Sequence, residues 1–197
     1  GEPTLYGHSQ GHEPLLTLIC EAKKMGWEYV RVDTNGVFES SLLEKEDFRK
    51  LDEITFSLDG HTHEINDLLR GKGVFAKCLS NINKAVNLGY NVDISACVHR
   101  GNMGAEGDGK LLLDSLIHFV ASLLVRRINF HPIFKMGVPR DTWIGENDIS
   151  PEEWKNVHQH LLKNIDSKSY SIPVRIPERF VSQEEFERNP DYYGYCP

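Results

Sequence analysis

The stretch ITFSLDG at residues 54–60 predicts a β-strand that ends in a polar turn. Residues 54–58 are rich in β-branched and aromatic side chains, which favour extended backbone, whereas Asp59 and Gly60 favour turns. Three further segments have the same form, at residues 29–32, before Thr34-Asn35-Gly36, at residues 92–98, and at residues 128–130, where Pro132 ends regular pairing. The chain therefore contains four expected strands.

Helical patterns separate these strands. Apolar residues recur at three- and four-residue steps over residues 14–25, 73–86 and 111–125, as they do along the buried face of a helix. A helical stretch is also expected around residues 45–51. Strands that alternate with helices form a parallel sheet through right-handed crossovers. The predicted fold class is α/β, and four strands suit a partial (β/α) TIM-like barrel that is incomplete at the N-terminus.

The region after residue 137 changes character. Ser150 precedes a proline and two glutamates, which together give a helix cap, a first-turn proline and acids near the positive end of the helix dipole. This helix is expected to reach about Asn164, and the proline- and tyrosine-rich residues beyond it predict an irregular tail. We therefore divide the chain into a core at residues 1–137 and a C-terminal helix and tail at residues 138–197.

Composition places the chain among soluble globular proteins. It has 197 residues, of which 40% are hydrophobic and 26% charged. The net charge of -7, without a basic stripe, disfavours direct nucleic-acid binding. The sequence shows no apolar stretch that could cross a bilayer and no signal peptide, so we expect a cytoplasmic location. Cys20, Cys78 and Cys97 match no metal or redox spacing and are expected to be buried thiols.

Ligands of parallel α/β folds bind at the carboxyl ends of the strands. In this chain each such end is polar or glycine-rich, and this agreement indicates one shared binding site. The segments concerned are Gly1–Pro3, Thr34–Gly36, Ser57–Gly60, His99–Asn102 and Phe130–Pro132.

Several of these segments resemble motifs of the radical SAM enzymes. The matching residues are Gly1-Glu2-Pro3, Thr34-Asn35-Gly36, Ser57-Leu58-Asp59-Gly60, and the spaced His63, Arg70-Gly71 and Gly73-x-Phe75. The resemblance covers most of residues 1 to about 105 and implies binding of S-adenosylmethionine. It implies that Glu2, with the backbone of Gly1 and Pro3, receives the methionyl ammonium, and a carboxylate suits this task because charge-assisted hydrogen bonds are strong.

The resemblance implies roles for the other strand ends too. Ser57 and Asp59 would lie near the methionyl and ribose groups, beside Thr34 and Asn35. The remaining candidates for cofactor contact are Arg100, which could also pair with a carboxylate, Asn102, and His131, whose strand would border the adenine chiefly through its backbone.

One element of the family is absent from this sequence. The Cys-x-x-x-Cys-x-x-Cys loop, which supplies three thiolates to a 4Fe-4S cluster, would lie upstream of Gly1, so this segment by itself is expected to be inactive. With that loop and an electron donor, the resemblance implies reductive cleavage of S-adenosylmethionine to a 5′-deoxyadenosyl radical, which abstracts hydrogen from an unidentified substrate. A peptide or protein substrate would agree with Cys196, which suits the first ligand of an auxiliary cluster of the SPASM/twitch type.

Two other functions remain open at the level of sequence. His61 and His63 follow a strand and could bind zinc or manganese in a metal-dependent barrel hydrolase. A non-catalytic relative could also keep the radical-SAM-like fold as a binding module.

Overall fold

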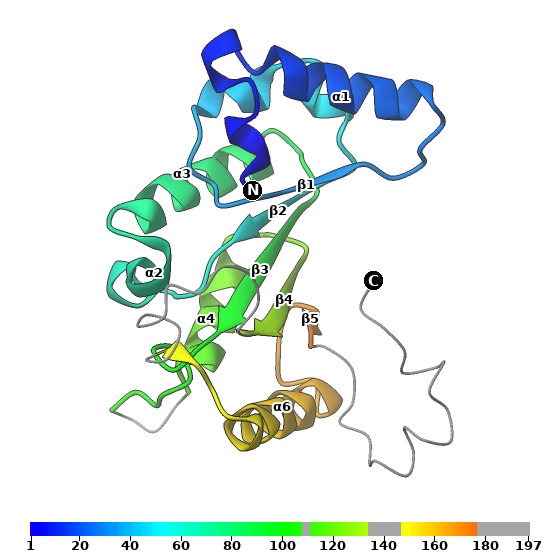
Figure 1. Cartoon of the computed structure of the whole chain (residues 1–197). Helices are drawn as coiled ribbons and strands as arrows, with labels where there is room; N and C mark the ends of the chain where they lie inside the picture. Colours follow the sequence, from blue (N-terminus) through cyan, green and yellow to red (C-terminus); the bar gives the residue numbers. More distant parts are fainter. Residues whose placement is uncertain (108–110, 134–146, 177–197) are drawn as a thin grey trace.

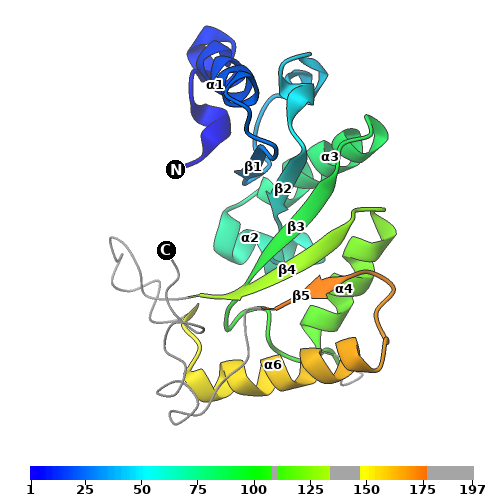
Figure 2. The same ribbon diagram turned by 90° about the vertical axis from the view of Figure 1, so that its right-hand side faces the viewer.

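The computed structural model describes residues 1–107, 111–133 and 147–176 of the chain. Within these ranges a twisted parallel sheet runs through the centre of the molecule, and helices lie against one of its faces and beyond its two edges (Figure 1). Turned by 90°, α3 and α4 are seen on one side of the sheet, with α1 beyond its first strand and α6 beyond its last (Figure 2). The other side of the sheet is its concave face.

The sheet has five parallel strands in the order in which they occur along the chain. They are β1 (Arg31–Thr34), β2 (Glu53–Ser57), β3 (Val92–Val98), β4 (Arg127–Pro132) and β5 (Val174–Arg175). This confirms the predicted α/β class with a parallel sheet. Sequence analysis missed β5, because a strand of two residues is too short to show an alternating pattern.

Helices connect the strands on the outer face. They are α1 (Glu13–Lys24), α2 (His63–Arg70), α3 (Val74–Asn87), α4 (Leu112–Ser122) and α6 (Pro151–Asp166). The predictions for α1, α3, α4 and α6 are confirmed within a few residues, including the cap at Ser150, which forms a complete capping box with Glu153. Sequence analysis missed α2, because its eight residues give too short a window for the apolar spacing of Ile65, Leu68 and Leu69 to stand out.

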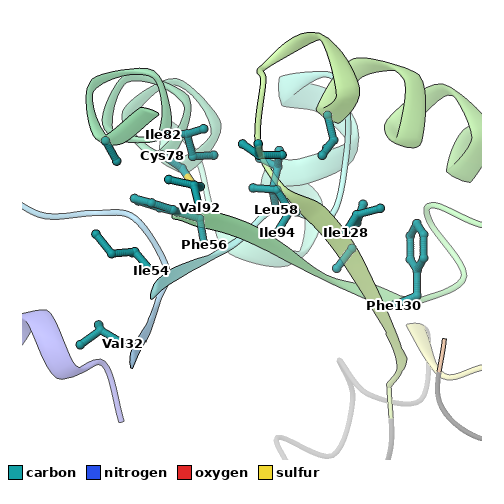
Figure 3. Close-up of a cluster of buried hydrophobic side chains, with 14 of the residues drawn as sticks. Val32, Ile54, Phe56, Leu58, Cys78, Ile82, Val92, Ile94, Ile128 and Phe130 are labelled. Carbon is teal, nitrogen blue, oxygen red and sulfur yellow. The ribbon is translucent and has the colours of Figure 1, made fainter. Parts of the chain in front are cut away.

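The hydrophobic core lies between the sheet and these helices. Ile54 and Phe56 of β2 point toward Cys78 and Ile82 of α3, and all four side chains are fully buried (Figure 3). Successive side chains of a strand point to opposite faces, so Thr55, between Ile54 and Phe56, faces the concave side. The same alternation in the other strands separates an apolar outer face from a polar inner face.

Two details of the prediction are wrong. The first strand begins at Arg31 rather than Tyr29 and includes Thr34, because pairing with β2 starts at Arg31. The stretch at residues 45–51 forms no α-helix but the short 3-10 helix η4 (Phe48–Lys50), and a second 3-10 helix, η3 (Ser40–Glu44), precedes it; both pack their few apolar side chains into the core. Tertiary packing determines the conformation of such short segments. By contrast, β4 ends at Pro132 as predicted.

The amino-terminal end of the sheet holds a buried ionic network that sequence analysis did not anticipate. The carboxylates of Glu53 and Asp93 have no exposed surface and both pair with Arg126 and Arg127. Arg127 Nη2 lies 3.1 Å from Glu53 Oε2, and Arg126 Nε lies 3.0 Å from Asp93 Oδ1. Opposite charges are needed here because an unpaired buried carboxylate is strongly unfavourable. The network lies at the end of the sheet opposite Thr34 and Ser57, the last residues of β1 and β2, and its Arg127 also lines the cavity described below.

The C-terminal part of the described chain packs on the same core. Trp154 and Leu161 of α6 belong to the same buried apolar cluster as Ile128 and Phe130 of β4, and β5 pairs with β4. The boundary expected after residue 137 falls outside the described residues and stays a prediction. Across the described ranges, no helix has the length and apolarity that a membrane span requires.

Candidate cofactor site

The carboxylate of Glu2 joins the start of the chain to the end of β1. Its Oε1 accepts a hydrogen bond from the Thr34 hydroxyl at 2.7 Å, and its Oε2 accepts one from the backbone N–H of Asn35 at 2.7 Å. Glu2 also caps a short 3-10 helix, η1 (Pro3–Leu5), because Oε1 accepts the N–H and the hydroxyl of the buried Thr4 at 3.1 and 2.6 Å. The structure thus brings together three predicted site residues, Glu2, Thr34 and Asn35.

This environment keeps Glu2 ionised. Burial by itself would raise the pKa of the carboxyl group, but hydrogen bonds from Thr4, Asn35 and Thr34 outweigh it, and the net pKa is lowered. A carboxylate can accept about four hydrogen bonds, two on each oxygen. Among the described residues Oε2 receives one, from Asn35, so this oxygen retains capacity for a further donor such as an ammonium group.

The turn after β1 is held by α3. The Thr34 hydroxyl accepts the N–H of Gly36 at 3.1 Å, and Asn81 of α3 donates to the carbonyl oxygens of Gly36 and Phe38 at 2.9 and 3.0 Å. Gly36 has φ of 76°, and a Cβ at this position would lie 2.6 Å from Cys78 Sγ. Only glycine fits this turn, because both the backbone angle and the contact with α3 exclude a side chain.

The end of β2 is built differently from the expectation. Asp59 is fully buried, and its carboxylate forms a bidentate pair with Arg70 at 2.5 and 3.0 Å. Its Oδ1 also accepts the N–H of Cys97 at 2.7 Å. The Asp59 carboxylate therefore links β2, α2 and β3, and its expected contact with ribose stays a prediction.

Asn102 makes a second link between the strand ends. Its side-chain amide donates to the carbonyl oxygens of Asp59 and Cys97 at 2.9 and 2.8 Å, while its Oδ1 accepts the N–H of His99 at 2.9 Å. The residue is buried. Its polar atoms thus shape the loop after β3, which places Asn102 behind the strand ends.

Arg100 does pair with a carboxylate, but the partner belongs to α6. Its guanidinium contacts both oxygens of Glu153 at 2.8 and 3.0 Å and donates to the carbonyl of Asp148 at 3.1 Å. Glu153 is the capping-box residue of α6. The pair is exposed and connects the loop after β3 with the start of this helix, away from Glu2 and Thr34.

Ser57 and His131 line one cavity on the concave face. The cavity has a volume of about 380 Å³, and its polar walls include Asp33, Thr55, Ser57, Ser95, Asn129 and His131. Burial, with a smaller effect of Arg31, lowers the pKa of His131, so that the ring is neutral at pH 7. Two predicted site residues therefore share a cavity that also includes Asp33, the residue before Thr34 on β1, whereas Glu2, Thr34 and Asn35 do not line it.

Sequence analysis missed the arginines of this cavity, Arg31, Arg127 and Arg175. The search for site residues was confined to the carboxyl ends of the strands, whereas Arg31 and Arg127 stand at the first positions of their strands. A signal was present for Arg31 and Arg127: each lies one residue before a buried apolar side chain, so alternation places it on the opposite face.

The described histidines and cysteines do not form a metal centre. His61 pairs with Glu106 at 3.2 Å and the exposed His63 with Glu64 at 2.9 Å, and no cluster of three or more His, Cys, Asp or Glu ligands occurs among the described residues. This part of the structure gives no support to the metal-dependent hydrolase. Cys196 lies outside the described residues.

The expectation for the cysteines is confirmed for Cys78 and wrong for the other two. Cys78 is buried, and burial raises its pKa to about 12, so it remains a thiol. Cys20 and Cys97 are partly exposed. Cys97 stands on the concave face near Arg70, where spacing along the chain could not show its exposure.

Comparison with known proteins shows likeness of fold at low sequence identity. No family model matches the sequence, and no curated protein matches it either. Among solved structures, SuiB from Streptococcus suis superposes with a TM-score of 0.65 over 97% of this chain, at 12% identity, and the match covers 40% of SuiB. The structure of anSMEcpe with bound AdoMet gives a TM-score of 0.61 over 89% of this chain, at 16% identity, and 47% of that protein is covered.

A third match is coproporphyrinogen III oxidase (HemN) from Escherichia coli, a radical SAM enzyme. Its TM-score is 0.53 over 78% of this chain and 37% of HemN, at 9% identity. The chain thus spans less than half the length of each of these proteins. Over most of its described length, it has the partial TIM-like barrel fold of the radical SAM enzymes.

Proposed function

We propose that this chain is the S-adenosylmethionine-binding part of a radical SAM enzyme. The observation that carries the proposal is the contact of Glu2 with Thr34 and Asn35, which brings an ionised carboxylate to the carboxyl end of β1. The fold supports it, since ligands of parallel α/β sheets bind at this end. The similar protein anSMEcpe has been solved with bound AdoMet.

The residues fit the polar groups of this cofactor. Glu2 Oε2 has capacity for the methionyl ammonium, with the backbone of Gly1 and Pro3 beside it. Ser57 presents a hydroxyl in the neighbouring cavity, where it can bind a ribose or carboxylate oxygen, and neutral His131 borders the same cavity. Asp59, Arg100 and Asn102 support the strand ends through their contacts with Arg70, Glu153 and the backbone.

The thiolates of a 4Fe-4S cluster do not come from the described cysteines. Cys78 is a buried thiol, and no three cysteines lie together among the described residues. We therefore assign the cluster ligands to other residues of the complete gene product. With the cofactor held at Glu2 and a reduced cluster beside it, the two groups would supply the radical chemistry for abstraction of a hydrogen atom from the substrate.

A peptide or protein is the substrate class that we propose. SuiB has been solved with its precursor peptide SuiA, with a TM-score of 0.63 to this chain, and anSMEcpe with the peptide Kp18Cys, with a TM-score of 0.62. Both likenesses concern the fold at 14% and 16% identity, so the substrate of this chain requires its own measurement.

Calorimetric titration of the chain with S-adenosylmethionine tests the cofactor site. Glu2→Gln keeps the size of the side chain but removes the charge, and we expect binding to weaken by about tenfold, since hydrogen bonds to charged groups contribute about 1.5–3 kcal/mol. The matched control is Glu152→Gln in the first turn of α6, far from β1 along the chain, which should bind as the unmodified chain does. Equal affinity of both variants would remove Glu2 from the site.

A second test concerns the reaction. The complete gene product, reconstituted with iron and sulfide without oxygen and then reduced, should release 5′-deoxyadenosine from S-adenosylmethionine. A protein that binds the cofactor without forming this product would be the non-catalytic binding module instead.

A further inference from the structure

Three arginines converge on the concave cavity of a chain whose net charge is -7. Arg31 comes from β1, Arg127 from β4 and Arg175 from β5. Strand alternation places them on the same face, and the register of β4 and β5 pairs Arg175 with Asn129, which also lines the cavity. Cationic side chains thus gather where the overall composition is acidic.

The protein itself neutralises two of these arginines. Arg127 pairs with the buried carboxylates of Glu53 and Asp93. Arg31 lies 3.3 Å from Asp33 and 3.8 Å from Glu53. Their guanidinium groups are therefore fixed in place by internal acids.

Arg175 differs from the other two. The described residues include no acid in ion-pair contact with it, whereas each of the other cavity arginines has two. The three cavity arginines and Arg126 carry four positive charges, whereas the acids that pair with them, Asp33, Glu53 and Asp93, carry three negative charges. Because His131 is neutral, one positive charge remains. The cavity wall thus has one positive charge that its own acids do not compensate.

The shape and chemistry of the wall suit an oxyanion. A guanidinium group presents parallel N–H donors that match a carboxylate or a phosphate. Hydroxyl groups of Thr55, Ser57 and Ser95 provide further donors on the same wall. A volume of about 380 Å³ accommodates a side chain or a small molecule that carries such a group.

We propose that this cavity binds a carboxylate or phosphate group of the substrate, with Arg175 as the principal contact. The inference deepens the proposed function and rests on it, because it places the acidic group of the substrate beside the cofactor site that Ser57 borders. The substrate is then an acidic molecule, such as a peptide with an Asp, Glu or phosphorylated side chain near its reacting position.

Protection of arginines from phenylglyoxal tests the cavity without any cofactor. The chain is modified at constant ionic strength with rising succinate, inorganic phosphate or neutral succinamide, and each arginine is followed by peptide mass spectrometry. At a probe concentration ten times its Kd, modification of Arg175 should slow by about tenfold, by mass action. Arg49, whose Nη2 donates to the Leu88 carbonyl on the outer side of the sheet, is the internal control and should keep its rate.

The three probes distinguish the possible results. Protection by succinate alone assigns a carboxylate, and protection by phosphate alone assigns a phosphate; both support the proposal. Equal slowing at Arg175 and Arg49, protection by succinamide, or no protection overturns it. Protection of Arg175 by S-adenosylmethionine alone would assign the arginine to the cofactor and would also overturn it.

A pair of variants makes the assignment specific. Arg175→Gln should abolish the protection of Arg31 by the effective probe, whereas Lys155→Gln, which removes an exposed charge on α6, should leave it unchanged. Retained protection of Arg31 in Arg175→Gln contradicts the role of Arg175. Calorimetry with S-adenosylmethionine distinguishes this inference from the proposed cofactor site. If the unmodified chain binds the cofactor but binds no oxyanion, only the inference about Arg175 is refuted.

Discussion

Asp59 and Arg70 form a bidentate ion pair in which the carboxylate is fully buried and the arginine side chain is 22% exposed. The pair connects the end of β2 to the last turn of α2, and the same carboxylate receives the N–H of Cys97 from β3. It therefore fixes two strand ends and one helix relative to each other, at the carboxyl end of the sheet.

Removing the acid should destabilise the fold. We expect Asp59→Ala to lower the free energy of unfolding by about 3 kcal/mol, because it leaves a largely buried guanidinium unpaired. Urea unfolding followed by circular dichroism measures this change. The control is Arg100→Ala, which breaks a bidentate but exposed pair with Glu153 and should have a much smaller effect. Equal losses of unfolding free energy in the two variants would show that burial of the Asp59–Arg70 pair does not increase its contribution to stability.

Gly36→Ala should be more harmful than Gly26→Ala, although both glycines have positive φ, of 76° and 87°. A Cβ at Gly36 meets Cys78 Sγ at 2.6 Å and Cys78 Cα at 3.0 Å, whereas at Gly26 nothing lies within 4 Å. We expect about 1 kcal/mol for Gly26→Ala, from the backbone alone, and at least about 2 kcal/mol for Gly36→Ala. Urea unfolding of both variants measures the difference, and similar costs would contradict the close approach of α3.

Glu2 should make stability depend on pH in the acidic range. Its pKa is lowered in the folded chain, so its stabilising contribution is complete above the ordinary Glu pKa, about 4.3, and is lost as pH falls through the lower folded value. The difference in unfolding free energy between the unmodified chain and Glu2→Gln should therefore shrink on acidification. Urea titrations at neutral pH and below the ordinary pKa measure it, and a difference that stays constant would contradict the ionised, hydrogen-bonded state.

Arg127 should contribute more to stability than Arg126, although both contact Glu53 and Asp93. The Arg127 side chain is 17% exposed and that of Arg126 is 42% exposed, so water screens the second pair more. We expect Arg127→Gln to cost about 2 kcal/mol, below the value for an isolated buried pair because Arg126 remains. Arg126→Gln should cost less, and the reverse order in urea unfolding would contradict this ranking.

Local patterns predicted much of the fold because they depend on neighbours in the chain. The apolar spacing of residues 73–86 and the β-branched run at residues 92–98 correspond closely to α3 and β3. By contrast, α2 and β5 were missed, since eight and two residues are too few to show a clear periodic pattern, and contacts with the rest of the molecule determine their conformations.

The candidate site was predictable only in part. The polar strand ends indicated Glu2, Thr34 and Asn35, and the structure joins them by hydrogen bonds. The same reasoning placed Asp59 and Asn102 at the ligand, which stays a prediction, but it did not foresee the protein groups that their side chains contact. The residue type at a strand end shows which groups a side chain can bind, but not which of them it contacts in the folded protein.

By itself, the sequence determined the alternation of strands and helices, the parallel sheet, the turn at Gly36 and the helix cap at Ser150, because these follow from periodicity and backbone chemistry within a few residues. Only the tertiary structure decided that Glu2 contacts Thr34, that Arg70 neutralises Asp59, and that arginines from β1, β4 and β5 share one cavity. These contacts join residues separated by whole helices, and the packing of the crossovers against the sheet selects them from the many pairings that the same charges would allow.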